Sequence, residues 1–119
     1  MQKLTLQEEE AMQVIWQRGG GVIKDFLEQL KEPRPPYTTL ASTVKNLVKK
    51  GYVTARKTGN TYWYEPAFPE SEYKRTFMSG FVQDYFRNSY KELVTFFAKD
   101  EKISPDELKE IIRMIENKK

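Results

Sequence analysis

Hydroxyl, amide and ammonium groups gather in one stretch of this chain, between residues 38 and 49. Leu40, Val44 and Leu47 recur there at helical spacing, which predicts an amphipathic helix with a polar outer side. Short hydroxyl side chains at its amino end would approach a phosphate or base edge closely, and longer side chains would reach into a major groove. This pattern favours contact with nucleic acid, although a solvated helix face has the same spacing. The outer residues are Thr38, Thr39, Ser42, Lys45, Asn46 and Lys49.

A second polar group lies in a predicted β-hairpin. Two segments of strand character, 52–57 and 61–65, flank Gly59 and Asn60, which supply the reversal. The tip would present cations and small polar groups to a DNA backbone or minor groove, and its plainer interpretation is a solubilising turn. The candidate residues here are Arg56, Lys57, Thr58 and Asn60.

Charge supports the nucleic-acid interpretation. Residues 37–68 hold five basic side chains and one acidic side chain, a local excess that suits a polyanion. The chain has no Cys and no His, which removes the usual zinc and copper ligands and thiol nucleophiles. We therefore expect no cofactor, no metal and no enzymatic activity. No apolar run approaches the roughly 20 residues that cross a bilayer, so we expect no membrane insertion and a cytoplasmic location.

Three helices and the hairpin must position these groups. Thr5 and Glu8 form a predicted capping box that begins a first helix ending at Gly19, and a second helix stops at the prolines of 33–36. Thr38 or its neighbour is the expected N-cap of the third helix, and Gly51 its stop. Three helices followed by a hairpin predict a winged helix-turn-helix domain over residues 1–68, in a mainly α chain with a small β-hairpin.

The residue pattern of 69–119 predicts a helical dimerisation region. Large aromatic residues recur there at helical spacing, Asn88 and Ser89 separate two segments, and Ser104 caps a final helix. Three short helices cannot bury so many rings alone, so pairing with a second copy is expected; the alternative is that the tail folds back as a core extension. The predicted interface consists of Tyr73, Phe77, Phe81, Tyr85, Tyr90, Leu93, Val94, Phe97, Leu108, Ile111, Ile112 and Ile115.

A scattered set of residues between positions 4 and 66 forms a pattern found in a known family. The residues are Leu4, Thr5, Glu8, Met12, Ile15, Trp16, Thr39, Leu47, Val48, Lys49, Lys50, Gly51, Gly59, Tyr62, Tyr64 and Pro66. Through them, residues 4–66 resemble the penicillinase-repressor family, the BlaI/MecI/CopY transcriptional regulators. The tail is similar in length and texture to the dimerisation region of the β-lactam-responsive members.

The resemblance implies a homodimeric repressor bound to a dyad-symmetric DNA operator. It would place Thr38, Thr39, Ser42, Thr43 and Asn46 in the major groove, and Lys45, Lys49, Arg56 and Lys57 on phosphates. Asn46 stands where the family often carries Arg, so the operator sequence is not carried over. The copper-responsive branch uses a cysteine-rich site, which this chain lacks.

The resemblance also implies a regulator, a membrane protease sensor whose action leads to cleavage of the tail between an Asn and a Phe. Phe96 stands where that Asn would be, so the cleavage position is not carried over. A different class of function stays open beside the repressor: because a fold alone does not fix function, a winged helix can serve as a protein-interaction adaptor without sequence-specific DNA binding.

Overall fold

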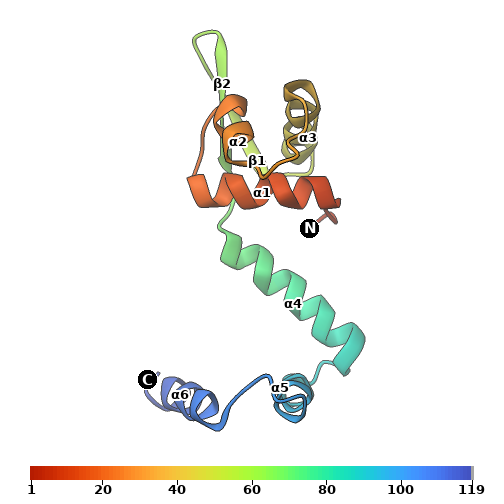
Figure 1. Cartoon of the computed structure of the whole chain (residues 1–119), viewed down its shortest axis with the longest axis vertical. Helices are drawn as coiled ribbons and strands as arrows, with labels where there is room; N and C mark the ends of the chain where they lie inside the picture. Colours follow the sequence, from red (N-terminus) through yellow and green to blue (C-terminus); the bar gives the residue numbers. More distant parts are fainter. Residues whose placement is uncertain (119) are drawn as a thin grey trace. The chain divides into compact units, whose positions relative to one another are not determined.

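The computed structural model describes residues 1–118. The chain divides into two compact units, Met1–Lys74 and Arg75–Lys119. The prediction of a mainly α chain with a small hairpin is confirmed (Figure 1). The elements are α1 (Leu6–Arg18), α2 (Ile23–Gln29), α3 (Tyr37–Lys49), β1 (Val53–Thr58), β2 (Thr61–Pro66), α4 (Glu70–Phe86), α5 (Tyr90–Lys99) and α6 (Pro105–Glu116).

Helix α1 begins at the predicted capping box. The backbone N–H of Thr5 donates to Glu8 Oε1 at 2.8 Å, and the Glu8 N–H donates to the Thr5 hydroxyl at 3.2 Å. The helix ends at Gly19, whose φ of 84° is left-handed and favours glycine. Both ends of α1 therefore follow from local sequence.

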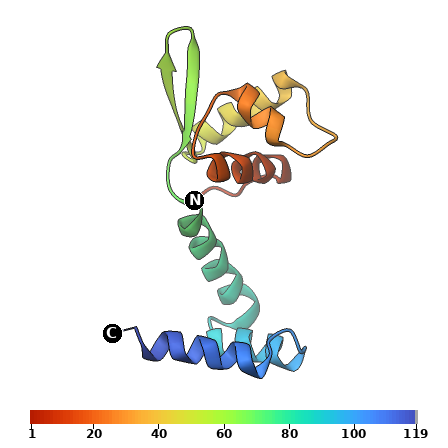
Figure 2. The ribbon, with the colours of Figure 1, turned by 60° about the vertical axis from the view of Figure 1, so that its left-hand side comes forward.

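Strands β1 and β2 form an antiparallel hairpin joined by a two-residue turn, since Thr58 pairs with Thr61. Gly59 takes a φ of 63°, a left-handed value that suits glycine at the first central position of such a turn. Gly21 adds an antiparallel bridge to Tyr64, with N–H to carbonyl distances of 2.9 and 2.8 Å in the two directions. The segment between α1 and α2 thus supports the base of the hairpin, which extends away from the helices (Figure 2).

A single apolar core holds α1, α2, α3 and the base of the hairpin together. It buries the apolar face predicted for α3, so the opposite face of this helix is left outward. The largest side chains that this core encloses completely or almost completely are Met12, Ile15, Phe26, Val44, Leu47 and Tyr52.

Tyr73 belongs to the first unit. Its ring centroid lies 5.3 Å from that of Trp16 and 5.9 Å from that of Tyr52, and its hydroxyl donates to Glu9 Oε2 at 3.4 Å. The units consequently divide after Lys74, beyond the predicted boundary at residue 68. The assignment of Tyr73 to a dimer interface is corrected for the same reason, because its ring packs inside the winged-helix unit.

The second unit contains most of α4 together with α5 and α6. Arg87 and Asn88 take left-handed φ values of 52° and 62°, which end α4 close to the predicted break, and Ser89 then caps α5. Between residues 75 and 118, Val82 alone is buried, and the helices make few contacts with one another. None of the helices within residues 1–118 has the length and apolar character to span a bilayer.

Candidate nucleic-acid interface

The outward face of α3 is a row of exposed polar and cationic side chains. Among residues 1–118, none of these side chains has a hydrogen-bond or ion-pair partner. The sequence of α3 contains no carboxylate, so nothing in the helix offsets its lysines. The face presents hydroxyl, amide and ammonium groups that are all available to an external partner. We call it the outer α3 face; it consists of Thr38, Thr39, Ser42, Lys45, Asn46 and Lys49.

The amino end of α3 is open to an anion. The N-cap is Pro36, whereas the sequence predicted Thr38 or its neighbour. No side chain caps the first turn. Thr38 lies inside that turn, which corrects its predicted capping role. The uncapped backbone N–H groups and the helix dipole both favour a negative group such as a phosphate here.

Thr43 is the one α3 residue whose predicted DNA contact is contradicted. Its side chain is buried, 9% exposed, and its hydroxyl donates to the Thr39 carbonyl oxygen at 3.0 Å. At 100° per residue, position 43 falls on the side of Leu40 and Val44, which face the core. Thr43 is therefore a core-facing residue.

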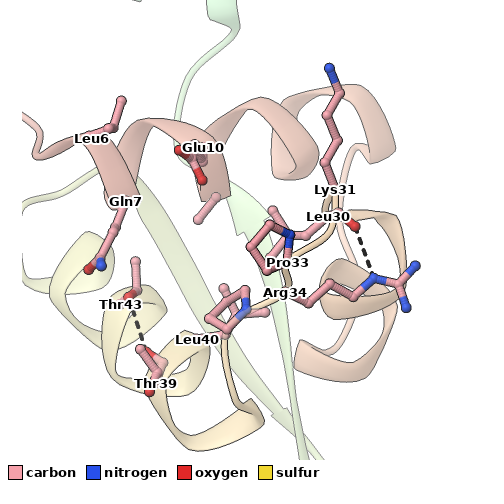
Figure 3. A pocket seen from close by; sticks show the side chains of 12 residues that line it. Leu6, Gln7, Glu10, Leu30, Lys31, Pro33, Arg34, Thr39, Leu40 and Thr43 are labelled. Atoms are coloured by element: carbon pink, nitrogen blue, oxygen red, sulfur yellow. Dashed lines mark hydrogen bonds between the residues drawn. The ribbon is translucent and has the colours of Figure 1, made fainter.

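A pocket of about 330 Å³ lies beside the first turn of α3 (Figure 3). Within it, the Arg34 Nε donates to the Leu30 carbonyl oxygen at 2.9 Å, and Nη2 donates to that of Glu28 at 2.9 Å. Arg34 thus caps the carboxyl end of α2 through two of its donors. Of the residues lining this pocket, Thr39 is the one that also belongs to the outer α3 face.

The hairpin places its two cations on opposite faces. Arg56 is paired across the strands with Trp63, and Lys57 with Tyr62, so alternation sends their side chains to different sides. Arg56 Nη2 lies 3.8 Å from Glu65 Oε1, whereas Lys57 has no ion-pair partner within residues 1–118. Lys57 is therefore the unopposed cation of the β1–β2 hairpin, which we call the wing. Thr58 and Asn60 are exposed at its tip, as predicted.

Tyr37 and Tyr62 are exposed aromatic residues that the sequence analysis did not assign to the interface. They are 53% and 49% exposed, and Tyr62 lies 6.3 Å from Tyr64 between ring centroids. Burial raises the pKa of Tyr64, and the nearby Tyr37 and Tyr62 add to that shift. Their positions in the sequence could have indicated them: Tyr37 directly precedes the polar face of α3, and Tyr62 pairs with Lys57 across the hairpin.

The family of the chain follows from comparison with known proteins. The family model described as "Penicillinase repressor" matches residues 4–117. The chain belongs to the penicillinase repressor family. The resemblance drawn from its sequence is confirmed, and the relatives named below are regulators and repressors rather than enzymes.

Two relatives of this family member show how far the similarity extends. The methicillin resistance regulatory protein MecI of Mammaliicoccus sciuri is 27% identical over 113 residues, covering 94% of this chain and 91% of the relative. The penicillinase repressor of Bacillus licheniformis is 24% identical over 113 residues, covering 94% and 88% respectively. Similarity therefore includes both units.

Solved structures of the family match the winged helix. The solution structure of the DNA-binding domain of the repressor BlaI has a TM-score of 0.52 and 28% identity, covering 61% of this chain and 94% of that domain. Bacillus licheniformis BlaI, solved as a monomeric form in complex with the blaP half-operator, has a TM-score of 0.50 and 26% identity, covering 60% and 89%. These neighbours confirm the winged-helix prediction.

Proposed function

We propose that this penicillinase repressor family member is a homodimeric transcriptional repressor that binds a dyad-symmetric DNA operator through α3 and the wing. The observation that carries the proposal is the outer α3 face, whose polar and cationic side chains are exposed and unpaired among residues 1–118. Short side chains near the amino end suit base edges, and Lys45 and Lys49 suit phosphates. Lys57, and more weakly Arg56, would hold the flanking backbone.

The half-operator complex of Bacillus licheniformis BlaI supports this docking. A winged helix that occupies one half of an operator leaves the other half for a second copy, and two-fold protein symmetry then matches dyad DNA symmetry. We infer the same division for this chain: one winged helix on each half-site, with α3 in the major groove.

The second unit supplies the proposed dimer contact. Its apolar side chains are largely outside any core of a single chain; for example, Tyr85 is 74% exposed and Ile115 is 69% exposed. An apolar surface of this kind is typical of an interaction site, and a second copy presents a matching one. The proposed interface retains Phe77, Phe81, Tyr85, Tyr90, Leu93, Val94, Phe97, Leu108, Ile111, Ile112 and Ile115.

The proposed regulator is a membrane protease sensor that acts on the second unit, with the repressor itself in the cytoplasm. Weakening the dimer would release DNA because it removes the high effective concentration of the second winged helix. Phe96, the residue at the position of the family's Asn, lies within α5 and its ring centroid is 5.8 Å from that of Phe86. The proposal therefore assigns no cut at Phe96.

A DNA selection followed by titration tests the function. The full-length protein selects duplexes from a randomised pool, and the enriched duplex is compared with a scrambled duplex of equal length and composition at several salt concentrations. We expect a dyad-symmetric enriched sequence, tighter binding to it, and affinity that falls as salt rises through counterion release. Equal affinity for both duplexes would reject a sequence-specific repressor.

The adaptor hypothesis has its own outcome. A variant in which Lys45, Lys49, Arg56 and Lys57 are all replaced by Met should lose DNA binding. Retention of a protein partner by that variant, in a pull-down from which DNA has been digested, together with no selected duplex, would favour the adaptor instead.

A further inference from the structure

An ion pair between a partly exposed ammonium and a buried carboxylate joins the carboxyl end of α3 to the amino end of α1. Lys50 Nζ lies 2.6 Å from Glu8 Oε1, and the Glu8 side chain is only 5% exposed. The same Glu8 oxygen accepts the Thr5 backbone N–H at 2.8 Å in the capping box. Glu8 thus connects the start of one helix with the C-cap residue of another.

Two further bonds strengthen this connection. Lys50 Nζ donates to the Lys3 carbonyl oxygen at 2.9 Å, and the hydroxyl of Tyr52 donates to the carbonyl oxygen of Gln2. Tyr52 is 1% exposed. The residues that directly follow α3 are therefore held at three points by residues 2–8.

Lys50 differs from the other lysines of α3 in its surroundings. Lys45 and Lys49 are exposed and have no ion-pair partner among residues 1–118, whereas the Lys50 side chain is 22% exposed and directed to a buried carboxylate. Moving Lys50 to a phosphate would leave the Glu8 charge buried without its partner, which is costly. Lys50 is consequently poorly placed to contact DNA.

We propose that Glu8 and Lys50 are positioning residues that fix the orientation of α3 and thereby determine how well the protein discriminates its operator from other DNA. The inference rests on the proposed function. Base readout requires side chains held within about 0.5 Å and 10–20° of their working geometry, whereas lysines reach phosphates through flexible stems. Loosening the end of α3 should therefore weaken operator binding much more than binding to random DNA.

Matched substitutions test the proposal on the full-length protein. Glu8→Gln keeps an acceptor for the capping box but removes the charge, and Lys50→Met keeps the stem but removes the ammonium. Each should lower the ratio of affinity for the enriched duplex to that for the scrambled duplex by about tenfold, with an unchanged salt slope, and the double variant should lose little more than either single variant. Lys49→Met is the control: it should weaken binding to both duplexes and reduce the slope by about 0.9.

The direction of the change in DNA affinity in Glu8→Gln separates a positioning role of Lys50 from a phosphate contact. If Lys50 were a phosphate contact, freeing it from Glu8 would tighten binding to both duplexes, and Lys50→Met would reduce the salt slope like Lys49→Met. Either result would overturn the proposal. A wild-type protein with no preference between the duplexes would reject the proposed repressor function. The positioning of α3 by the ion pair would then be tested by NMR on the DNA-free protein. Amide NMR shifts should move along residues 46–50 in Glu8→Gln; shifts confined to α1 would reject positioning of α3.

Discussion

Lys57 and Tyr62 stand directly opposite each other across the hairpin, while the neighbouring pair of Arg56 and Trp63 points to the other face. The ring centroid of Tyr62 also lies 6.3 Å from that of Tyr64, a buried residue of the apolar core. The Lys57 face is therefore the face of the hairpin that continues into the apolar core at its base, through Tyr64 and Val53. Arg56 lies on the other side, where Glu65 partly offsets its charge.

Replacement of Lys57 by Met should weaken binding to all duplex DNA and reduce the salt slope by about 0.9, because one released counterion is lost. Arg56→Met should have a smaller effect, since its charge is already screened by Glu65 and solvent. Titrations of both variants at several salt concentrations check the order. An Arg56 effect equal to or larger than that of Lys57 would contradict this assignment of the two faces.

Removal of the Tyr62 hydroxyl should produce a different signature. A tyrosine hydroxyl can donate to a phosphate oxygen but carries no charge, so Tyr62→Phe should cost about 1 kcal/mol of DNA binding with no change in salt slope. The control is Tyr73→Phe, whose hydroxyl contacts Glu9 inside the unit. We expect that control to leave affinity for the enriched duplex unchanged; an unchanged affinity in Tyr62→Phe would remove it from the interface.

The sequence predicted several element ends in both units well because these ends depend on local chemistry. The capping box at Thr5, the reversal at Gly59 and the break at Asn88 all lie where expected. Periodicity also separated the two sides of α3. The family resemblance, rather than periodicity, placed Thr43 in the major groove; at 100° per residue it falls on the core side, where its hydroxyl donates to the Thr39 carbonyl oxygen one turn back.

Contacts between distant residues could not be predicted from the sequence. The packing of Tyr73 on Trp16 depends on how the chain returns after the hairpin, and the pairing of Lys50 with Glu8 joins residues 42 positions apart in the sequence. In the sequence, Lys50 looks the same as its neighbour Lys49. Their different surroundings arise from tertiary structure.

Thr43 and Ser42 provide a direct test of the corrected face of α3. Thr43→Val keeps the shape of a buried side chain and should leave DNA affinity unchanged. Ser42→Ala and Asn46→Ala should each cost roughly 1 to 3 kcal/mol on the enriched duplex and little on the scrambled one. A loss of discrimination in Thr43→Val, at unchanged thermal stability, would return Thr43 to the DNA-facing set.

The stability of the first unit should depend on the ionisation of Glu8. Burial alone would raise the pKa of this carboxyl, but hydrogen bonds from Lys50 and Thr5 outweigh burial and lower the pKa below its ordinary 4.5. Because the folded-state pKa is the lower one, the contribution of Glu8 is present above pH 4.5 and is lost as pH falls through the folded-state value. Lys50 and the buried Tyr52 are the titratable groups nearby, and burial raises the pKa of the Tyr52 hydroxyl above its ordinary 10.0, so this hydroxyl stays protonated over this range.

Thermal unfolding of wild type and Glu8→Gln between pH 7 and pH 3 measures this contribution. The variant should be less stable at pH 7 by about 2 kcal/mol, and the difference should shrink as the pH falls below 4.5. A difference that stays constant over this range would show that the charge of Glu8 contributes nothing to stability.

The apolar side of α6 provides the test of dimer formation. Ile112 is 52% exposed in the single chain, so a lysine at this position costs a folded monomer little. In a symmetric dimer the substitution occurs twice, and Ile112→Lys should weaken association by on the order of 3 kcal/mol, about a hundredfold. Glu110→Lys adds the same side chain on the opposite side of α6 and should leave association unchanged. Light scattering over a dilution series measures both variants.

Binding to a duplex carrying a single half-site should be equal in the two, whereas binding to the full dyad should fall only in Ile112→Lys, because only that variant loses the effective concentration of the second winged helix. A wild-type protein that remains monomeric at high concentration would contradict the dimer and leave the apolar faces of the second unit to another partner.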